Sequence, residues 1–159
     1  MKALSDKLDN TLFYFRGYPT LIDKADFFSQ VHNRKNFIFE GQYTYPDDLE
    51  DIYSKVHFTW AFEFVNEDYN SKWLLPNRLY EGGLFNKPLL APEDFYIGKV
   101  VKEMGIGWTF CEPYTRNLLE FLEEVSESEY CSKVNTLSKI PRSHFLVTND
   151  INRLLDNIL

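Results

Sequence analysis

Short apolar runs alternate with amphipathic segments between residues 11 and 125, and this alternation most constrains the fold. Runs rich in β-branched and aromatic residues predict buried strands at 11–16, 36–40, 57–62, 88–91 and 106–110. Apolar residues at helical spacing predict helices at about 22–32, 47–56, 76–83, 97–104 and 118–125. Such an alternation builds βαβ units with parallel strands. The sequence therefore predicts an α/β, Rossmann-like three-layer domain with a mainly parallel sheet of about five strands.

The chain divides into a domain core and a tail. Residues 1–125 are predicted to form the Rossmann-like domain, and residues 126–159 its helical C-terminal tail. The Ser/Glu-rich stretch at 126–130 is predicted to be a joint, because helical patterns continue beyond it. The last helix would carry an apolar stripe that needs a partner: its own sheet, another domain, or a second copy in a homodimer. That stripe consists of Ile151, Leu154, Leu155 and Ile158.

Composition excludes several classes of function. A formal charge of −7 and a pI near 5.0 argue against a duplex nucleic acid or an anionic membrane as partner. Cys111 and Cys131 lack paired CxxC spacing, so neither a disulfide framework nor a zinc site is predicted, and both thiols are expected to be buried and reduced. No signal peptide opens the chain, and no apolar run approaches the roughly 18 residues of a membrane span. We expect a cytoplasmic location, at most peripheral to the inner face of the membrane.

Common catalytic and metal motifs are missing. There is no GxGxxG, no GxxxxGK[ST] and no GxSxG, which argues against dehydrogenase, kinase and hydrolase chemistry. An acidic loop at 63–71 holds Glu63, Glu67 and Asp68, but their spacing fits no calcium loop. No metal site is predicted, and the catalytic residues stay unknown.

The segment PNRLYEGG predicts a helix start with a ligand-binding character. Pro76 suits a first helical position, and Arg78 and Glu81 stand three residues apart on one face. Free N–H groups, with Asn77 and Arg78, could hold a diphosphate. The carboxylate of Glu81 could accept two hydrogen bonds from neighbouring sugar hydroxyls. The alternative is an ordinary surface ion pair between Arg78 and Glu81.

Two further loops are predicted to face this helix start. Ligands of parallel α/β sheets bind beyond the carboxyl ends of the strands. Arg16 and Gly17 follow the first predicted strand, and Gly41 and Gln42 follow the second, with Tyr43 placed to flank a base. All three segments could therefore border one crevice.

These motifs carry a family resemblance over about residues 11–125. The succession FIFEGQYTYPDDLEDIYSKVHFTWAF, PNRLYEGGLFNKPLLA and GIGWTF resembles the C-terminal, nucleotide-sugar-binding domain of GT-B glycosyltransferases of the family 4 type. The resemblance implies that Glu81 holds the ribose hydroxyls, that Arg78 and the helix start meet the diphosphate, and that Gly41 and Gln42 meet the base. Arg16 and Gly17 stand where the family has a glycine-arginine pair, here in reverse order. Trp73 occupies the place, eight residues before Glu81, where many members have a second glutamate.

The resemblance implies an activity and its partners. The chain would be the donor-binding half of a glycosyltransferase that moves a hexose from a UDP-sugar, or another nucleotide sugar, to a saccharide or lipid-linked acceptor. The acceptor would bind a missing N-terminal domain or a partner subunit, no metal or other cofactor would be needed, and the isolated chain would be inactive. Two alternatives stay open: a non-catalytic nucleotide-sugar-binding module or split subunit, and an α/β domain without a nucleotide site.

Overall fold

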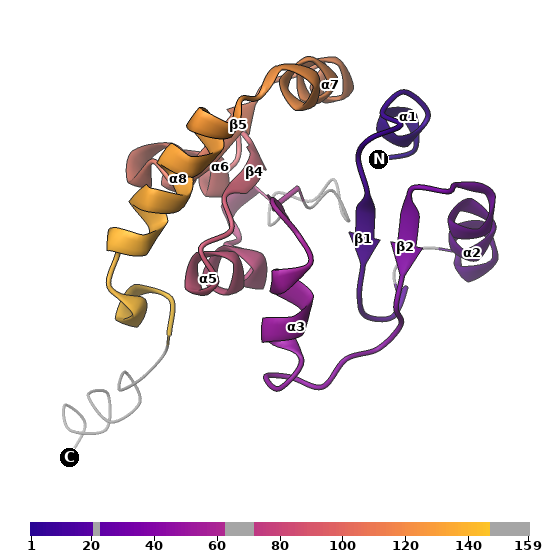
Figure 1. The fold of residues 1–159 in the computed structure, drawn as a ribbon, viewed down its shortest axis with the longest axis horizontal. Helices are drawn as coiled ribbons and strands as arrows, with labels where there is room; N and C mark the ends of the chain where they lie inside the picture. The colour runs from indigo at the N-terminus through magenta and orange to yellow at the C-terminus, as the bar shows by residue number, and fades with distance from the viewer. Residues whose placement is uncertain (21–22, 63–71, 147–159) are drawn as a thin grey trace.

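A computed structural model describes residues 1–20, 23–62 and 72–146 of the chain. Short helices and strands alternate along it, as the sequence predicts (Figure 1). The first elements are α1 (Lys2–Ser5), β1 (Phe13–Phe15), α2 (Lys24–Asn33), β2 (Phe37–Phe39), α3 (Leu49–Ser54) and β3 (Thr59–Trp60). The later ones are α5 (Asn77–Leu84), β4 (Leu89–Pro92), α6 (Tyr96–Met104), β5 (Gly107–Phe110), α7 (Tyr114–Glu124), α8 (Glu127–Lys139) and a 3₁₀ turn, η1 (Arg142–His144).

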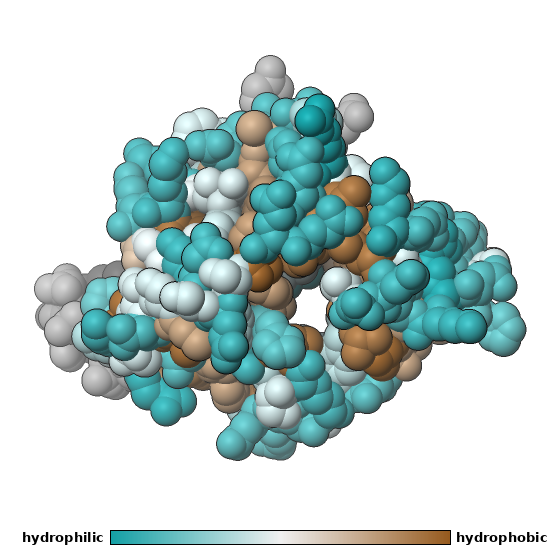
Figure 2. Space-filling model, turned by 45° about the horizontal axis from the view of Figure 1, so that its top comes forward, coloured by the Kyte–Doolittle hydropathy of each residue, from teal (hydrophilic) through white to brown (hydrophobic). Residues whose placement is uncertain are grey.

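The strands are parallel, but they form two sheets rather than one. β1 pairs with β2, with Phe13 opposite Phe37, and β4 lies between β3 and β5, with Leu89 opposite Thr59 and Gly107. The prediction of α/β structure with parallel strands is confirmed. A continuous five-stranded sheet is not what the described residues show, because no ladder joins β1 to β3. Figure 2 shows the surface hollowed near the middle of one face.

Aromatic and aliphatic side chains, rather than main-chain hydrogen bonds, connect the two sheets. Phe13 and Phe37 from the first sheet are buried in one cluster with Leu90 and Phe110 from the second. α1 contributes Leu4 to the same cluster and lies beside α7 (Figure 1). Contacts between side chains of this cluster therefore hold the two sheets together.

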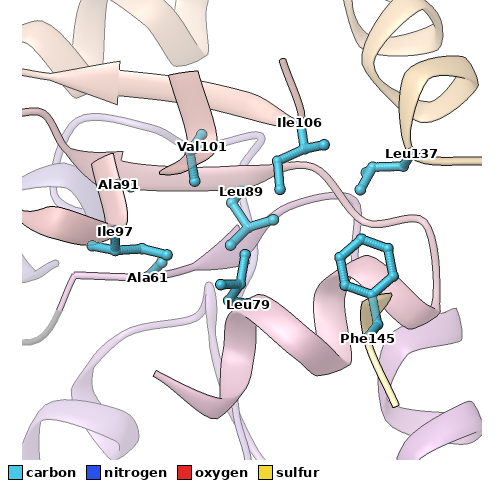
Figure 3. Close-up of a cluster of buried hydrophobic side chains, with 9 residues drawn as sticks. All are labelled: Ala61, Leu79, Leu89, Ala91, Ile97, Val101, Ile106, Leu137 and Phe145. Atoms are coloured by element: carbon cyan, nitrogen blue, oxygen red, sulfur yellow. The ribbon is translucent and has the colours of Figure 1, made fainter. Parts of the chain in front are cut away.

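A second core surrounds β4, the most buried strand (Figure 3). Helices α5 and α6 and the chain after α8 pack their apolar residues against it. Gly107 makes the β4–β5 contact possible, because a Cβ there would lie 2.1 Å from the carbonyl oxygen of Leu89. The cluster consists of Ala61, Leu79, Leu89, Ala91, Ile97, Val101, Ile106, Leu137 and Phe145.

Several element boundaries differ from the sequence-based expectations. Pro76 is the N-cap of α5, with φ −70° and ψ 150°, rather than its first helical residue. Gly82 lies inside α5 instead of ending it, and lets the helix approach Thr59, whose Oγ1 would lie 2.7 Å from an added Cβ. The helix predicted over about ten residues at 47–56 is α3, which has six, and the strand predicted at 57–62 pairs only through Thr59 and Trp60. By contrast, Gly105 ends α6 in the left-handed region, as glycine commonly does.

The predicted joint at 126–130 is the start of a helix. Ser126 caps α8 in a capping box with Glu129, so the two helices α7 and α8 follow one another without a linker. The predicted acidic loop at 63–71 and the apolar stripe formed by Ile151, Leu154, Leu155 and Ile158 lie outside the described residues.

The two cysteines differ from expectation as well. Cys111 and Cys131 are free thiols, as predicted, but both are exposed rather than buried. Cys111 comes directly after β5, and Cys131 lies on α8, the helix that borders the second core through Leu137. In the parts of the chain that the structure describes, no helix is both long enough and apolar enough to cross a membrane.

Candidate functional site

The loops after β1 and β2, two of the three segments predicted to border one crevice, contact each other. The N–H of Gly17 donates a hydrogen bond of 2.8 Å to the carbonyl oxygen of Gly41. Gly17 has φ +107° and Gly41 has φ +73°, values at which a side chain is strained. Both loops leave the carboxyl ends of parallel strands, which is where ligands bind in such folds. Gln42 follows as an exposed residue.

Arg16 is committed to protein partners at this junction. One guanidinium nitrogen donates to the carbonyl oxygen of Glu40 at 2.9 Å, and the other lies 3.7 Å from a carboxylate oxygen of Asp48. Only 15% of the Arg16 side chain is exposed, and its Nε is buried without a hydrogen-bond partner among the described residues. The nitrogen that bonds to the Glu40 carbonyl also lies 3.5 Å from a carboxylate oxygen of Glu40. Arg16 therefore connects the two loops, and two carboxylates face its charge.

Glu40 is the centre of this polar network. Its Oε2 accepts hydrogen bonds from the hydroxyl of Tyr14 at 2.5 Å and from Lys55 Nζ at 2.9 Å. The bond from Tyr14, followed by the bond and charge of Lys55, holds the pKa of the Glu40 carboxyl below its ordinary value. Lys55, at the end of α3, also pairs with Asp51 of that helix at 2.8 Å. Its bond to Glu40 therefore connects α3 to the end of β2.

The start of α5 offers unpaired donors. Pro76 supplies no side-chain cap, and no acidic residue occupies the first turn. The carbonyl oxygen of Pro76 accepts from the N–H of Leu79, and within the described residues no partner accepts from the N–H groups of Asn77 and Arg78, which lie at the positive end of the helix dipole. The side chains of both residues are exposed. Since α5 leads into β4 of a parallel sheet, its start lies toward the carboxyl ends of the strands.

Glu81 is held by a neighbour that the sequence analysis did not single out. Its Oε2 accepts a hydrogen bond of 2.8 Å from the hydroxyl of Tyr53 on α3. Across the described part of the chain no ion pair joins Arg78 to Glu81, so the alternative of a surface ion pair is wrong for this geometry. Glu81 is half-buried, one turn beyond the exposed Arg78.

Tyr53 is rigidly placed. It is only 6% exposed, and its ring stacks on Phe85 with centroids 5.2 Å apart and planes 5° apart. Burial, and then the negative charge of Glu81, raise the pKa of Tyr53 far above its ordinary value, so its hydroxyl keeps the proton that it donates. The fixed phenol therefore defines where one oxygen of Glu81 lies.

Tyr43 links the two halves of the candidate site. Its ring lies next to Gly17, since a Cβ at that glycine would be 3.9 Å from Tyr43 Cε1. Tyr43 and Arg78 are both close enough to Tyr53 to act on the pKa of its hydroxyl. The loops at Gly17 and Gly41 thus lie near α3, and α3 bonds to Glu81. The ligand-binding roles of Glu81, Arg78, Asn77, Arg16, Gly17, Gly41 and Gln42 stay predictions.

A pocket of about 400 Å³ opens at the carboxyl ends of β4 and β5. The hydroxyl of Tyr114 donates a 2.5 Å hydrogen bond to Asp94 there, and burial followed by that bond raises the pKa of Tyr114. The sequence analysis assigned none of its lining residues to a ligand site, although the strand-end rule applies to these loops too. It is lined by Glu93, Asp94, Cys111, Glu112 and Tyr114.

Sequence reasoning also missed Tyr53 and Glu40 as site residues. Tyr53 was assigned to the apolar face of its helix, and a signal was present there, because a buried tyrosine needs a partner for its hydroxyl. Glu40 stands at the end of a predicted strand, beside Gly41. Only the folded chain shows that three donors reach its carboxylate.

Fold and site together describe an α/β protein with parallel strands and polar groups gathered at their carboxyl ends. Over 124 residues the chain is 54% identical to the succinoglycan biosynthesis protein ExoL of Rhizobium meliloti (strain 1021). That match covers 78% of this chain but 31% of the relative. No protein-family model matches the sequence, and no solved structure matches the fold.

Proposed function

We propose that this chain is the donor-binding half of a glycosyltransferase. It would bind a nucleotide diphosphate sugar, most simply a UDP-sugar, for transfer of the hexose to a saccharide or lipid-linked acceptor. The observation that carries the proposal is the pairing of a fixed carboxylate, Glu81, with the free N–H groups and exposed Arg78 one turn earlier on α5. A nucleotide sugar has the matching groups, namely ribose hydroxyls and a diphosphate.

The relative supports this class of reaction. Its name places it in the biosynthesis of a glycan, and glycans are assembled by transferring sugars from activated donors. The sequence resemblance to the C-terminal domain of GT-B enzymes points to the same half of such an enzyme. Both the resemblance and the geometry at α5 favour donor binding, and both involve the PNRLYE segment.

The chemistry of the proposed site follows from where negative charge develops during the reaction. As the bond to the sugar breaks, negative charge grows on the diphosphate leaving group. Arg78 and the N–H groups at the start of α5 would stabilise that charge more strongly in the transition state than in the bound donor. This role of positive charge needs no metal. Glu81 would hold the ribose, and Gly41 and Gln42 would border the base.

The acceptor would be bound elsewhere. The groups proposed to bind the donor lie on the described residues, and the chain spans 31% of the length of its relative. We place the acceptor site on an N-terminal domain or on a partner subunit. The second candidate function uses the same donor site without transfer by this chain itself: the chain would be a nucleotide-sugar-binding module or a subunit of a split glycosyltransferase.

Calorimetric titration with UDP, GDP and ADP tests donor binding. We expect at least one of the three, with UDP first, to bind with a dissociation constant below millimolar. The matched control is inorganic pyrophosphate, which presents the diphosphate without the ribose and should bind more weakly. If no nucleotide binds below millimolar, the proposed function is lost.

A further inference from the structure

The hydrogen bond between Tyr53 and Glu81 crosses from α3 to α5. α3 follows β2 and α5 precedes β4, and the two residues are 28 positions apart in the sequence. The bond is 2.8 Å long and partly buried. It is therefore a tertiary contact that fixes one side chain of the candidate site from outside its own helix.

The hydrogen-bond donor, Tyr53, is held in place on both sides. Leu49 and Ile52, both buried, surround Tyr53 from its own helix, and Phe85 stacks against its ring from the end of α5. The hydrogen-bond acceptor, Glu81, is freer to move, because it is half-buried and a glutamate side chain has three rotatable bonds. Without the hydroxyl, nothing among the described residues would hold Oε2 of Glu81.

We propose that Tyr53 is a positioning residue of the nucleotide site: it holds Oε2 of Glu81 so that the carboxylate presents Oε1 to the ribose. This inference rests on the proposed function and adds to it a residue outside the α5 motif. Each carboxylate oxygen has two acceptor sites, so Tyr53 orients Glu81 while leaving it able to accept from the ligand.

The effect on affinity follows from pre-organisation. Immobilising a flexible side chain on binding costs about 0.5 to 1.5 kcal/mol, a cost already met in the free protein if Tyr53 holds Glu81. Tyr53→Phe keeps the stacked ring and removes only the hydroxyl. Its affinity for UDP should fall about two- to twelvefold, the range that corresponds to this cost.

The test compares two ligands on two variants. UDP and 2′,3′-dideoxy-UDP are titrated into the wild type, Tyr53→Phe and Tyr130→Phe. Tyr130 is the matched control, since its hydroxyl bonds to the carbonyl oxygen of His57, at the opposite ends of the strands. Tyr53→Phe should lose affinity for UDP but not for the dideoxy ligand, which has no ribose hydroxyl for Glu81. Tyr130→Phe should bind both ligands like the wild type.

The outcomes separate the two proposals. If the wild type binds no nucleotide, the proposed function fails and the positioning role fails with it. If the wild type binds UDP and Tyr53→Phe binds it equally well, donor binding stands and the positioning role is overturned. Equal losses for both ligands, including those of an unfolded variant, would assign Tyr53 a structural role and also overturn it. As a second measurement, the effect of Tyr53→Phe should vanish when Glu81→Ala, which leaves the hydroxyl no side-chain acceptor at that position, is already present.

Discussion

The N–H of Gly17 donates to the carbonyl oxygen of Gly41 at 2.8 Å, so the ends of two adjacent parallel strands are joined by their own main chain. The positive φ of each glycine aims the two loops at one another. Arg16 and Glu40, the residues just before them, strengthen the junction through a bond from guanidinium to carbonyl. This side of the candidate site is therefore shaped by backbone geometry, whereas the α5 side is shaped by side chains.

Replacing Glu81 by Gln should weaken nucleotide binding without unfolding the protein. The amide oxygen of glutamine can still accept from Tyr53, but the charged acceptor for ribose is lost. We expect a loss of about 1.5 to 3 kcal/mol, the range for hydrogen bonds to charged groups. Calorimetry with UDP measures it. Glu120→Gln, on the exposed i,i+4 pair with Arg116, is the control and should bind UDP normally.

Arg78→Ala should act on the diphosphate rather than on the nucleoside. Its exposed guanidinium lies at the start of α5, where the helix dipole also favours an anion. Affinity for UDP should therefore fall much more than affinity for uridine, in parallel titrations. Equal losses for the two ligands would count against this assignment.

Glu40 should make the free energy of unfolding depend on pH in the acid range. Its folded pKa is lowered, chiefly by the bond from Tyr14 and then by Lys55, so its stabilisation is fully present above the unfolded value of about 4.5. That stabilisation is lost as the pH falls through the lower folded pKa. Denaturant unfolding of wild type and Glu40→Gln at pH 7 and near pH 3 should show a smaller acid-induced loss in the variant. Glu103→Gln, whose pair with Lys99 is 3.9 Å long and exposed, is the control.

Gly107→Ala should severely destabilise the second sheet. The added Cβ would lie 2.1 Å from the carbonyl oxygen and 2.7 Å from the nitrogen of Leu89, in main chain that cannot move without breaking the β4–β5 ladder. We expect a loss of about 3 kcal/mol or more, measured by denaturant unfolding. Gly105→Asn is the control, because asparagine tolerates the left-handed conformation at φ +68°. Similar losses for both would contradict the close approach at Gly107.

The 159-residue chain alone should turn nothing over. Under the proposed function its described residues would provide only donor-side groups, with the acceptor on another domain or subunit. In a radiolabelled UDP-sugar assay, hydrolysis and transfer by the purified chain should both stay at background. Transfer by the chain alone would contradict this, and would mean that an acceptor site lies within these residues.

The local elements could be predicted from the sequence because their signals are local. Alternating apolar runs and helical stripes predicted the strands and most of the helices, among them a helix at 97–104 that corresponds to α6. Residue-level propensities act over a few positions, so they do not reveal which strands share a ladder. The pairing of strands into two sheets, and the packing of Phe13, Phe37 and Phe110 into one cluster, are contacts between distant segments.

For the candidate site, too, some features follow from the local sequence and others only from the folded chain. The PNRLYE segment by itself determined that Asn77, Arg78 and Glu81 share the start of one helix, because helical spacing places residues three apart on one face. Only the tertiary structure decided their environment. It turned Arg16 toward Glu40 and Asp48, and it brought Tyr53 from another helix to Glu81. Hydrogen-bond partners depend on distances of about 3 Å between side chains that are far apart in sequence, and those distances exist only once the chain is folded.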